Sequence, residues 1–124
     1  MESGELVQSA AYAGYFGVPP IMATGDEATC REARKFFGSS IVTVAVKKGI
    51  AREAAVLYPF EETRKALYEG AKRAMSVIKR CKPYLLELPI KAKMEYLQQV
   101  PELPKPKLVS KEGTIQDARH IFGF

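Results

Sequence analysis

The sequence predicts an α/β fold in which a strand–helix–strand core with parallel pairing is followed by a long amphipathic helix and a C-terminal strand pair. Two observations carry this prediction. The run Ile41–Val46 is short, β-branched and almost wholly apolar, which is typical of a strand covered on both faces. Residues 24–37 have helical spacing and lie between this run and an earlier apolar segment, and such a crossover joins parallel strands with a right-handed connection.

The chain opens with a helix that is unusually rich in small residues. We expect this helix over residues 4–16, packed closely against a neighbour, and we expect Gly17 to end it. The following segment VPPIMAT predicts a short buried strand through Val18, Ile21 and Met22. Two prolines lie at the entry to this strand, where proline is tolerated.

The middle of the chain predicts two further helices. Thr24 and Glu27 have capping-box spacing at the start of the first, which Gly38 ends. Residues 49–58 predict a loop with a short helical turn. Pro59 then opens the longest helix, and Pro83 stops it. Its apolar residues form one stripe at helical spacing: Leu67, Ala71, Ala74, Ile78 and Cys81.

The C-terminal part predicts a pair of strands. Loose alternation of apolar residues indicates a strand near a sheet edge: Leu86, Leu88, Ile90, Ala92 and Met94. Pro89 excludes a central position in the sheet. A proline-rich loop from Pro101 leads to a short strand around Leu108–Ser110 and a partial helix from Ile115.

Length and composition bound the class of protein. The 124 residues fit a single domain, 1–124, with an ordinary core. No apolar run approaches the ~20 residues that span a bilayer, and the first ten residues lack the pattern of a signal peptide, so we expect a cytoplasmic protein without a membrane partner. The net charge is +5, and the basic residues are spread along the chain with one concentration on the longest helix, where they are interleaved with glutamates. Such a pattern is typical of a solvated helix face, so we expect no nucleic-acid partner.

Few residues offer chemistry by spacing alone. Cys30 and Cys81 fall at apolar helical positions and are expected to be buried free thiols. His120 follows Asp117 by three residues, but a catalytic zinc takes three protein ligands, so we interpret it as an ordinary terminal histidine. We find no phosphate-binding loop, dinucleotide fingerprint or paired-histidine zinc motif.

A block of short motifs nevertheless resembles one known family. Gly4-Glu5-Leu6 opens the small-residue helix, which closes with Ala-Gly-Tyr-Phe at 13–16. A Val-Pro segment, Gly25-Asp26-Glu27, a helix with Glu-Ala at 32–33, a strand ending in Val-Lys at 46–47 and the turn GIAREAA follow in order. This arrangement resembles the D-aminopeptidase family of zinc-dependent peptidases, densely over residues 4–55 and loosely beyond.

The resemblance implies an activity and a metal. It implies metal-dependent removal of D-amino acids, above all D-alanine, from the N-termini of short peptides, and ring-like homo-oligomers. It also implies that Glu5 is a zinc ligand, which is sound chemistry for a carboxylate combined with imidazoles. The residues alone favour a plainer interpretation of Glu5, an acidic side chain stabilised by the dipole of a helix N-terminus.

This chain departs from the family pattern in what it lacks. Family members are longer, and their N-terminal part carries an Asp-x-Glu ligand pair, two histidine ligands and the proposed catalytic histidine. None of these matches a residue of this sequence, so we assign no catalytic residue. We expect a fragment, a truncated product or one half of a split enzyme whose partner chain supplies the rest. The alternative is a non-catalytic, oligomerising α/β module.

Three charged residues are candidates for substrate binding. Asp26 and Lys47 are expected at the carboxyl ends of the two parallel strands, where open α/β sheets build their sites, and Arg52 follows in the closing turn. Plainer interpretations stand beside these. Asp26 suits a helix cap, and Lys47 and Arg52 suit surface ion pairs of small energetic value.

Overall fold

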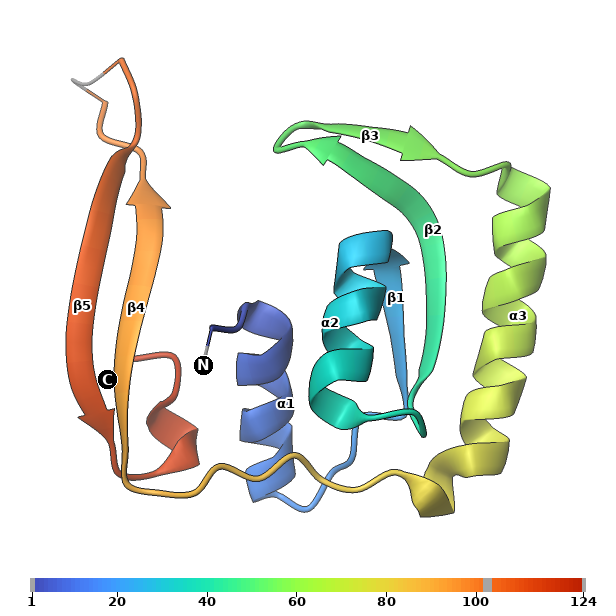
Figure 1. Cartoon of the computed structure of the whole chain (residues 1–124), viewed down its shortest axis with the longest axis horizontal. Coiled ribbons are helices and arrows are strands. Elements are labelled where there is room, and N and C mark those ends of the chain that lie inside the picture. Colours follow the sequence, from blue (N-terminus) through green and yellow to red (C-terminus); the bar gives the residue numbers. More distant parts are fainter. Residues whose placement is uncertain (1, 102–103, 124) are drawn as a thin grey trace. The chain divides into compact units, whose positions relative to one another are not determined.

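The computed structural model describes residues 2–101 and 104–123 (Figure 1). It forms two compact units, one up to Leu85 and one from Leu86 onward. The first unit contains α1 (Glu5–Tyr15), β1 (Met22–Asp26), α2 (Glu27–Phe37), β2 (Val42–Ala51), β3 (Ala54–Leu57), α3 (Phe60–Val77) and the short 3₁₀ helix η1 (Ile78–Arg80). The predicted α/β fold class is confirmed, whereas one domain over residues 1–124 stays a prediction.

The centre of the first unit is the parallel pair of β1 and β2, as the sequence predicts. Its register runs from Met22 opposite Val42 to Gly25 opposite Ala45. Helix α2 packs on one face of this pair and α3 on the other, which Figure 1 shows as one helix on each side of the strands. The expectation that Ile41–Val46 is covered on both faces is therefore confirmed. In the sheet order β1-β2-β3, β1 is an edge strand.

Small residues allow both helices to lie close to the strands. On the α2 face, Ala33 is fully buried and packs with Ala23 and Ile41. On the α3 face, Gly70 faces the strands so closely that an added Cβ would lie 2.6 Å from Cγ2 of Val44. Burial of apolar area and close packing both stabilise the folded state, so these contacts hold the two helices against the strands.

The strand β2 corrects one prediction. Residues 49–58 were expected to form a loop with a helical turn, but β2 continues to Ala51 and pairs with β3 in an antiparallel hairpin. Arg52 and Glu53 form its two-residue turn. The alanine- and glutamate-rich composition favours a helix locally, but pairing with β2 satisfies the backbone hydrogen bonds of this segment and overrides that propensity.

Two expected boundaries around β1 are also wrong. The strand begins at Met22, four residues later than expected, and Val18 is exposed, because Pro19 and Pro20 lack the N–H groups that pairing requires. Thr24 lies inside β1 and makes no capping box. Asp26 caps α2 instead, since its carboxylate accepts a 2.7 Å hydrogen bond from the backbone N–H of Thr29. Gly38 ends α2, as predicted.

Helix α3 begins after Pro59 as predicted, but its buried stripe is shifted. Gly70 and Ala74 are buried, whereas Ala71 and Ile78 are exposed. The predicted stripe does not include Gly70, yet this glycine marks the line of closest approach to the strands. The helix ends at Val77, before Pro83. Within the described ranges, none of the helices has both the length and the apolar character that a membrane crossing requires.

Helix α1 ends and packs as the small residues predict. Gly17 has a φ of 76°, and the backbone N–H groups of Gly17 and Val18 donate to the carbonyls of Gly14 and Ala13, which is a Schellman cap. At Gly14 an added Cβ would lie 2.0 Å from the carbonyl oxygen of Tyr84. The expected close neighbour of α1 is thus the backbone that follows α3.

The second unit is an antiparallel pair, β4 (Ile90–Gln98) and β5 (Lys107–Ile115), followed by the 3₁₀ helix η2 (Ala118–His120). The predicted strand pair is confirmed, with half-buried positions alternating at Ile90, Ala92 and Met94. Strand β4 starts only after Pro89, so Leu86 and Leu88 lie outside it, and β5 is longer than expected. Of the predicted proline-rich loop, residues 102 and 103 lie outside the described residues.

Opposite exchanges between glycine and alanine at two neighbouring positions of α3 test the close packing. Alanine is favoured over glycine in a helix by about 1 kcal/mol, so Ala71→Gly at the exposed position is expected to lower the free energy of unfolding by that amount. Gly70→Ala is expected to lower it as well, because overpacking against Val44 costs about 1–3 kcal/mol. Urea denaturation measures both. A stabilised Gly70→Ala protein would contradict the close approach of α3 to the sheet.

Candidate functional site

The carboxyl end of the parallel pair brings two of the three predicted binding residues together. Asp26 and Lys47 are register partners where the parallel pairing ends. Asp26 is the last residue of β1, as expected, but Lys47 lies inside β2, which continues to Ala51 to pair with β3. Gly49 lets the carboxylate of Asp26 come close to β2, since a Cβ there would lie 3.0 Å from Oδ2. Arg52 does not join them, because it lies in the exposed turn of the β2–β3 hairpin. The structure therefore gathers one acid and one base at this end of the sheet.

The carboxylate of Asp26 is held ionised. The hydrogen bond from the backbone N–H of Thr29 is the main cause that lowers the pKa of Asp26 below its ordinary value of 3.8, and the charge of Lys47 adds a smaller effect in the same direction. The same carboxylate caps α2. Asp26 is therefore both a helix cap and a charged group at the end of β1.

Glu5 is the first residue of α1, and its side chain is exposed. The turn that carries it is tied to α2 by a residue that spacing did not single out. The backbone N–H of Gly4 donates a 2.8 Å hydrogen bond to Oε1 of Glu32, across 28 residues of sequence. A carboxylate at a helix N-terminus also interacts favourably with the helix dipole. Glu32 thus fixes the start of α1, and with it the position of Glu5.

The described residues do not by themselves complete a metal site. No three histidine, cysteine, aspartate or glutamate side chains within residues 2–101 and 104–123 are grouped so that they would hold a metal ion. Zinc in catalytic sites takes three protein ligands. Glu5 is therefore a single carboxylate that would need ligands from elsewhere. In the second unit, the carboxylate of Asp117 bonds the guanidinium of Arg119, and the charge–charge hydrogen bonds lower its pKa to about 2. Asp117 is thus engaged in a local ion pair with Arg119, in agreement with the interpretation of His120 as an ordinary terminal histidine.

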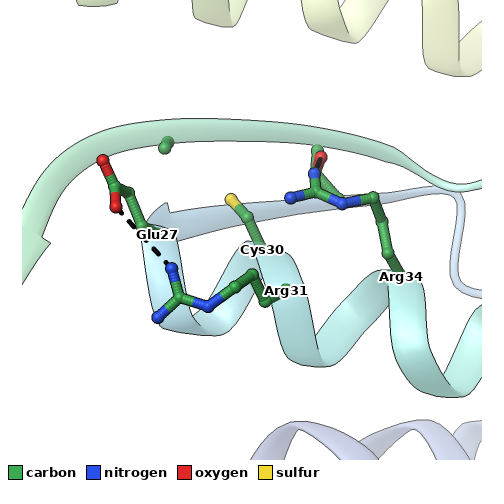
Figure 2. Close-up of a pocket in the computed structure, with 6 residues that line it drawn as sticks. Glu27, Cys30, Arg31 and Arg34 are labelled. Carbon is green, nitrogen blue, oxygen red and sulfur yellow. Dashed lines mark hydrogen bonds and ion pairs between the residues drawn. The ribbon is translucent and has the colours of Figure 1, made fainter.

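A pocket of about 270 Å³ opens beside α2 and β2 (Figure 2). Its lining is mostly charged or polar: Glu27, Cys30, Arg31, Arg34, Thr43 and Ala45. Figure 2 shows that Glu27, Cys30, Arg31 and Arg34 rise from successive turns of α2, with the sulfur of Cys30 turned toward β2. Thr43 and Ala45 belong to β2. Spacing on α2 contains the signal for this group, because residues 27, 30, 31 and 34 recur at three and four. From the sequence, Cys30 is expected as a buried thiol and Glu27 as a capping-box residue, but neither arginine is singled out.

The electrostatics of this pocket are set by its neighbours. The carboxylate of Glu27 accepts a hydrogen bond from the hydroxyl of Tyr58, and this bond raises the pKa of Tyr58. Cys30 is buried, and burial raises the pKa of its thiol, which is therefore neutral and weakly reactive. The expected free thiol at Cys30 is confirmed. Cys81 is also free but only half buried, and its Sγ lies 3.6 Å from the carbonyl of Ser40.

Comparison with known proteins gives a consistent result. The family model for D-aminopeptidases matches residues 1–101. Among solved structures, the Zn-dependent D-aminopeptidase DppA from Bacillus subtilis, a self-compartmentalizing protease, is similar with a TM-score of 0.76 and 21% sequence identity. That similarity covers 97% of this chain and 47% of DppA, so this chain spans about half the length of that relative. At such identity the likeness shows the fold. A search of curated proteins found no match.

Removing the carboxylate of Glu32 tests the tie between α1 and α2. We expect Glu32→Ala to speed hydrogen exchange at the amides of the first turn of α1 by roughly fivefold, since an exposed charged hydrogen bond contributes about 1 kcal/mol. Glu32→Gln keeps an acceptor and is expected to preserve most of the protection. Glu69→Ala, an exposed acid on α3, is the control. Equal exchange in all three proteins would show that Glu32 does not hold this turn.

Acid titration tests the cap of α2. The lowered pKa of Asp26 means that its contribution to stability is complete above roughly pH 5 and is lost as the pH falls below 3.8 toward the folded-state value. Asp26→Asn keeps a capping side chain but cannot titrate, so its melting temperature is expected to fall less than that of the wild type between pH 5 and pH 3. Glu53→Gln in the hairpin turn should follow the wild type. Parallel curves for Asp26→Asn and the wild type would contradict this assignment.

Proposed function

Since this chain belongs to the D-aminopeptidase family of peptidases, we propose that it forms one part of a zinc-dependent D-aminopeptidase and contributes Glu5 as a metal ligand. The observation that carries the proposal is the family match over residues 1–101, together with the position of Glu5 at the start of α1. The remaining ligands would come from residues outside this sequence. Zinc bound there would supply an activated water and polarise the scissile carbonyl.

The residues of this chain prepare the site by position. Glu32 holds the backbone of Gly4, so the carboxylate of Glu5 starts from a fixed helix end. A ligand held in place by its neighbours loses less conformational entropy when it binds a metal. Asp26 and Lys47, where the parallel pairing ends, are proposed to contact the short peptide. The carboxylate of Asp26 would bind the amino group of the peptide, and the ammonium of Lys47 would bind a carbonyl or the carboxylate of the peptide.

Assembly with other polypeptides is part of the proposal. The outer surface of α1 exposes aromatic side chains, with Tyr15 46% and Phe16 58% exposed, and the β2–β3 hairpin exposes Ile50, Val56 and Leu57. Exposed apolar groups that gather in this way are typical of surfaces that bind protein. We propose that these surfaces serve homo-oligomer formation and the docking of the polypeptide that supplies the other ligands. The relative DppA is itself self-compartmentalizing.

A second candidate function is a non-catalytic module that self-associates through the same surfaces. It is favoured by the lone carboxylate at Glu5, because the described part of the chain groups no three metal ligands. In that case the chain keeps the fold of the family without its chemistry. Metal content and activity distinguish the two functions.

The proposed function is tested by supplying the missing part. We expect co-expression of this chain with the polypeptide encoded directly upstream to give stoichiometric zinc by elemental analysis and to hydrolyse D-alanyl peptides in preference to L-alanyl peptides. Glu5→Gln is expected to reduce zinc content and activity by at least tenfold, because a ligand is lost. Glu2→Gln, an exposed acid of the same segment, should leave both unchanged.

Two results would contradict this function. Full zinc content and activity in the Glu5→Gln protein would exclude Glu5 as a ligand. A stable oligomer that holds neither zinc nor activity, even with the upstream polypeptide, would favour the non-catalytic module instead.

A further inference from the structure

The pocket between α2 and β2 has an excess of positive charge. It is lined by two guanidinium groups, Arg31 and Arg34, and by one carboxylate, Glu27. Glu27 lies 3.6 Å from Arg31, its i+4 neighbour, and also accepts a hydrogen bond from Tyr58. The single negative charge of Glu27 can balance only one of the two guanidinium groups. The pocket therefore keeps roughly one uncompensated positive charge.

That charge lies on Arg34. Its guanidinium donates one hydrogen bond to Oγ1 of Thr43, which is a neutral acceptor. Within residues 2–101 and 104–123, the structure pairs Arg34 with no acidic side chain. Because arginine carries five N–H donors in a planar fork, the bond to Thr43 orients the group and leaves other donors for a ligand. Figure 2 shows Arg34 at one end of the pocket and the pair of Glu27 and Arg31 at the other.

The rest of the lining suits a small oxyanion. Cys30 forms part of the wall as a neutral thiol, since burial raises its pKa, and so adds no negative charge. Ala45 is small and leaves space above β2. A cavity of about 270 Å³ is near the lower limit of ligand pockets, so it suits an amino acid or the end of a short peptide rather than a large cofactor.

From this geometry we propose that the pocket between α2 and β2 binds the carboxylate of a free amino acid or the C-terminal carboxylate of a short peptide, with Arg34 as the principal contact. Planar carboxylates match the guanidinium fork, and such charge-assisted pairs are stronger than neutral hydrogen bonds. Thr43 holds the fork in place, and Arg31 adds a second positive charge. The assignment to a peptide substrate or product rests on the proposed function, whereas the binding of a carboxylate does not.

The experiment is a set of calorimetric titrations of the whole chain at low salt. The ligands are D-alanine, D-alanyl-D-alanine and D-alanyl-D-alanine amide, which lacks the terminal carboxylate. We expect saturable binding of at least one acid and at least tenfold weaker binding of the amide. Tighter binding of the dipeptide than of D-alanine would identify a peptide end as the ligand, and equal binding would identify the amino-acid carboxylate.

Variants of neighbouring cations supply the controls. Arg34→Met is expected to weaken carboxylate binding at least tenfold, Arg34→Lys less, and Lys35→Met not at all, since Lys35 lies over the ring of Phe36 and outside the pocket. Arg31→Met provides an independent test of the pocket should Arg34→Met fail to fold, with an expected loss of at least threefold. Absent binding, equal affinity for acid and amide, or equal loss in Lys35→Met would overturn the proposal. The titrations measure binding and not hydrolysis. A negative peptidase assay would therefore contradict the proposed function without contradicting carboxylate binding in this pocket.

Discussion

The structure of the first unit depends on how closely two helices approach one pair of parallel strands. A parallel pair is buried on both faces, so each face needs a helix, and each helix needs a line of small residues. The closest approach is at Ala33 on α2 and at Gly70 on α3. Once both helices are seated, the end of the parallel pairing, at Asp26 of β1 and Lys47 of β2, is the part of the pair that remains open for chemistry. The charged groups of the candidate site gather there because of packing on the strands below them.

Single side chains of this chain combine structural and chemical tasks. Asp26 caps α2 and at the same time stays ionised at the strand end. Glu32 bonds the backbone of Gly4, and its neighbour Ala33 is the fully buried contact of α2 with the sheet. The Glu-Ala pair of the family pattern is thus explained physically, because one residue seats α2 and the other connects it to α1. A substitution at either position would be felt at both helices.

Much of the fold could be predicted from the sequence, because strong apolar patterns dominate where burial is deep. The parallel pair, the start of α3 after Pro59 and the alternation from Ile90 to Met94 are of this kind. The hairpin at Ala54–Leu57 was missed because its four residues are all exposed and their pairing is set by β2, not by their own pattern. For the site, Asp26 was predictable from the end of β1, whereas Lys47 was expected at a strand end and lies inside β2, because pairing with β3 extends that strand. Arg34 was not predictable, because its proposed role depends on the absence of an acidic partner among the described residues, which only the structure reveals.

The edge position of β1 leaves backbone groups that can pair with another polypeptide. Within the described part of the chain, the strand Met22–Asp26 pairs only on the side of β2, and it carries neither proline nor lysine, the residues that commonly protect an exposed edge. Its other backbone edge is therefore a template for any extended polypeptide. A strand from another polypeptide that paired with this edge would extend the sheet without any rearrangement of β1.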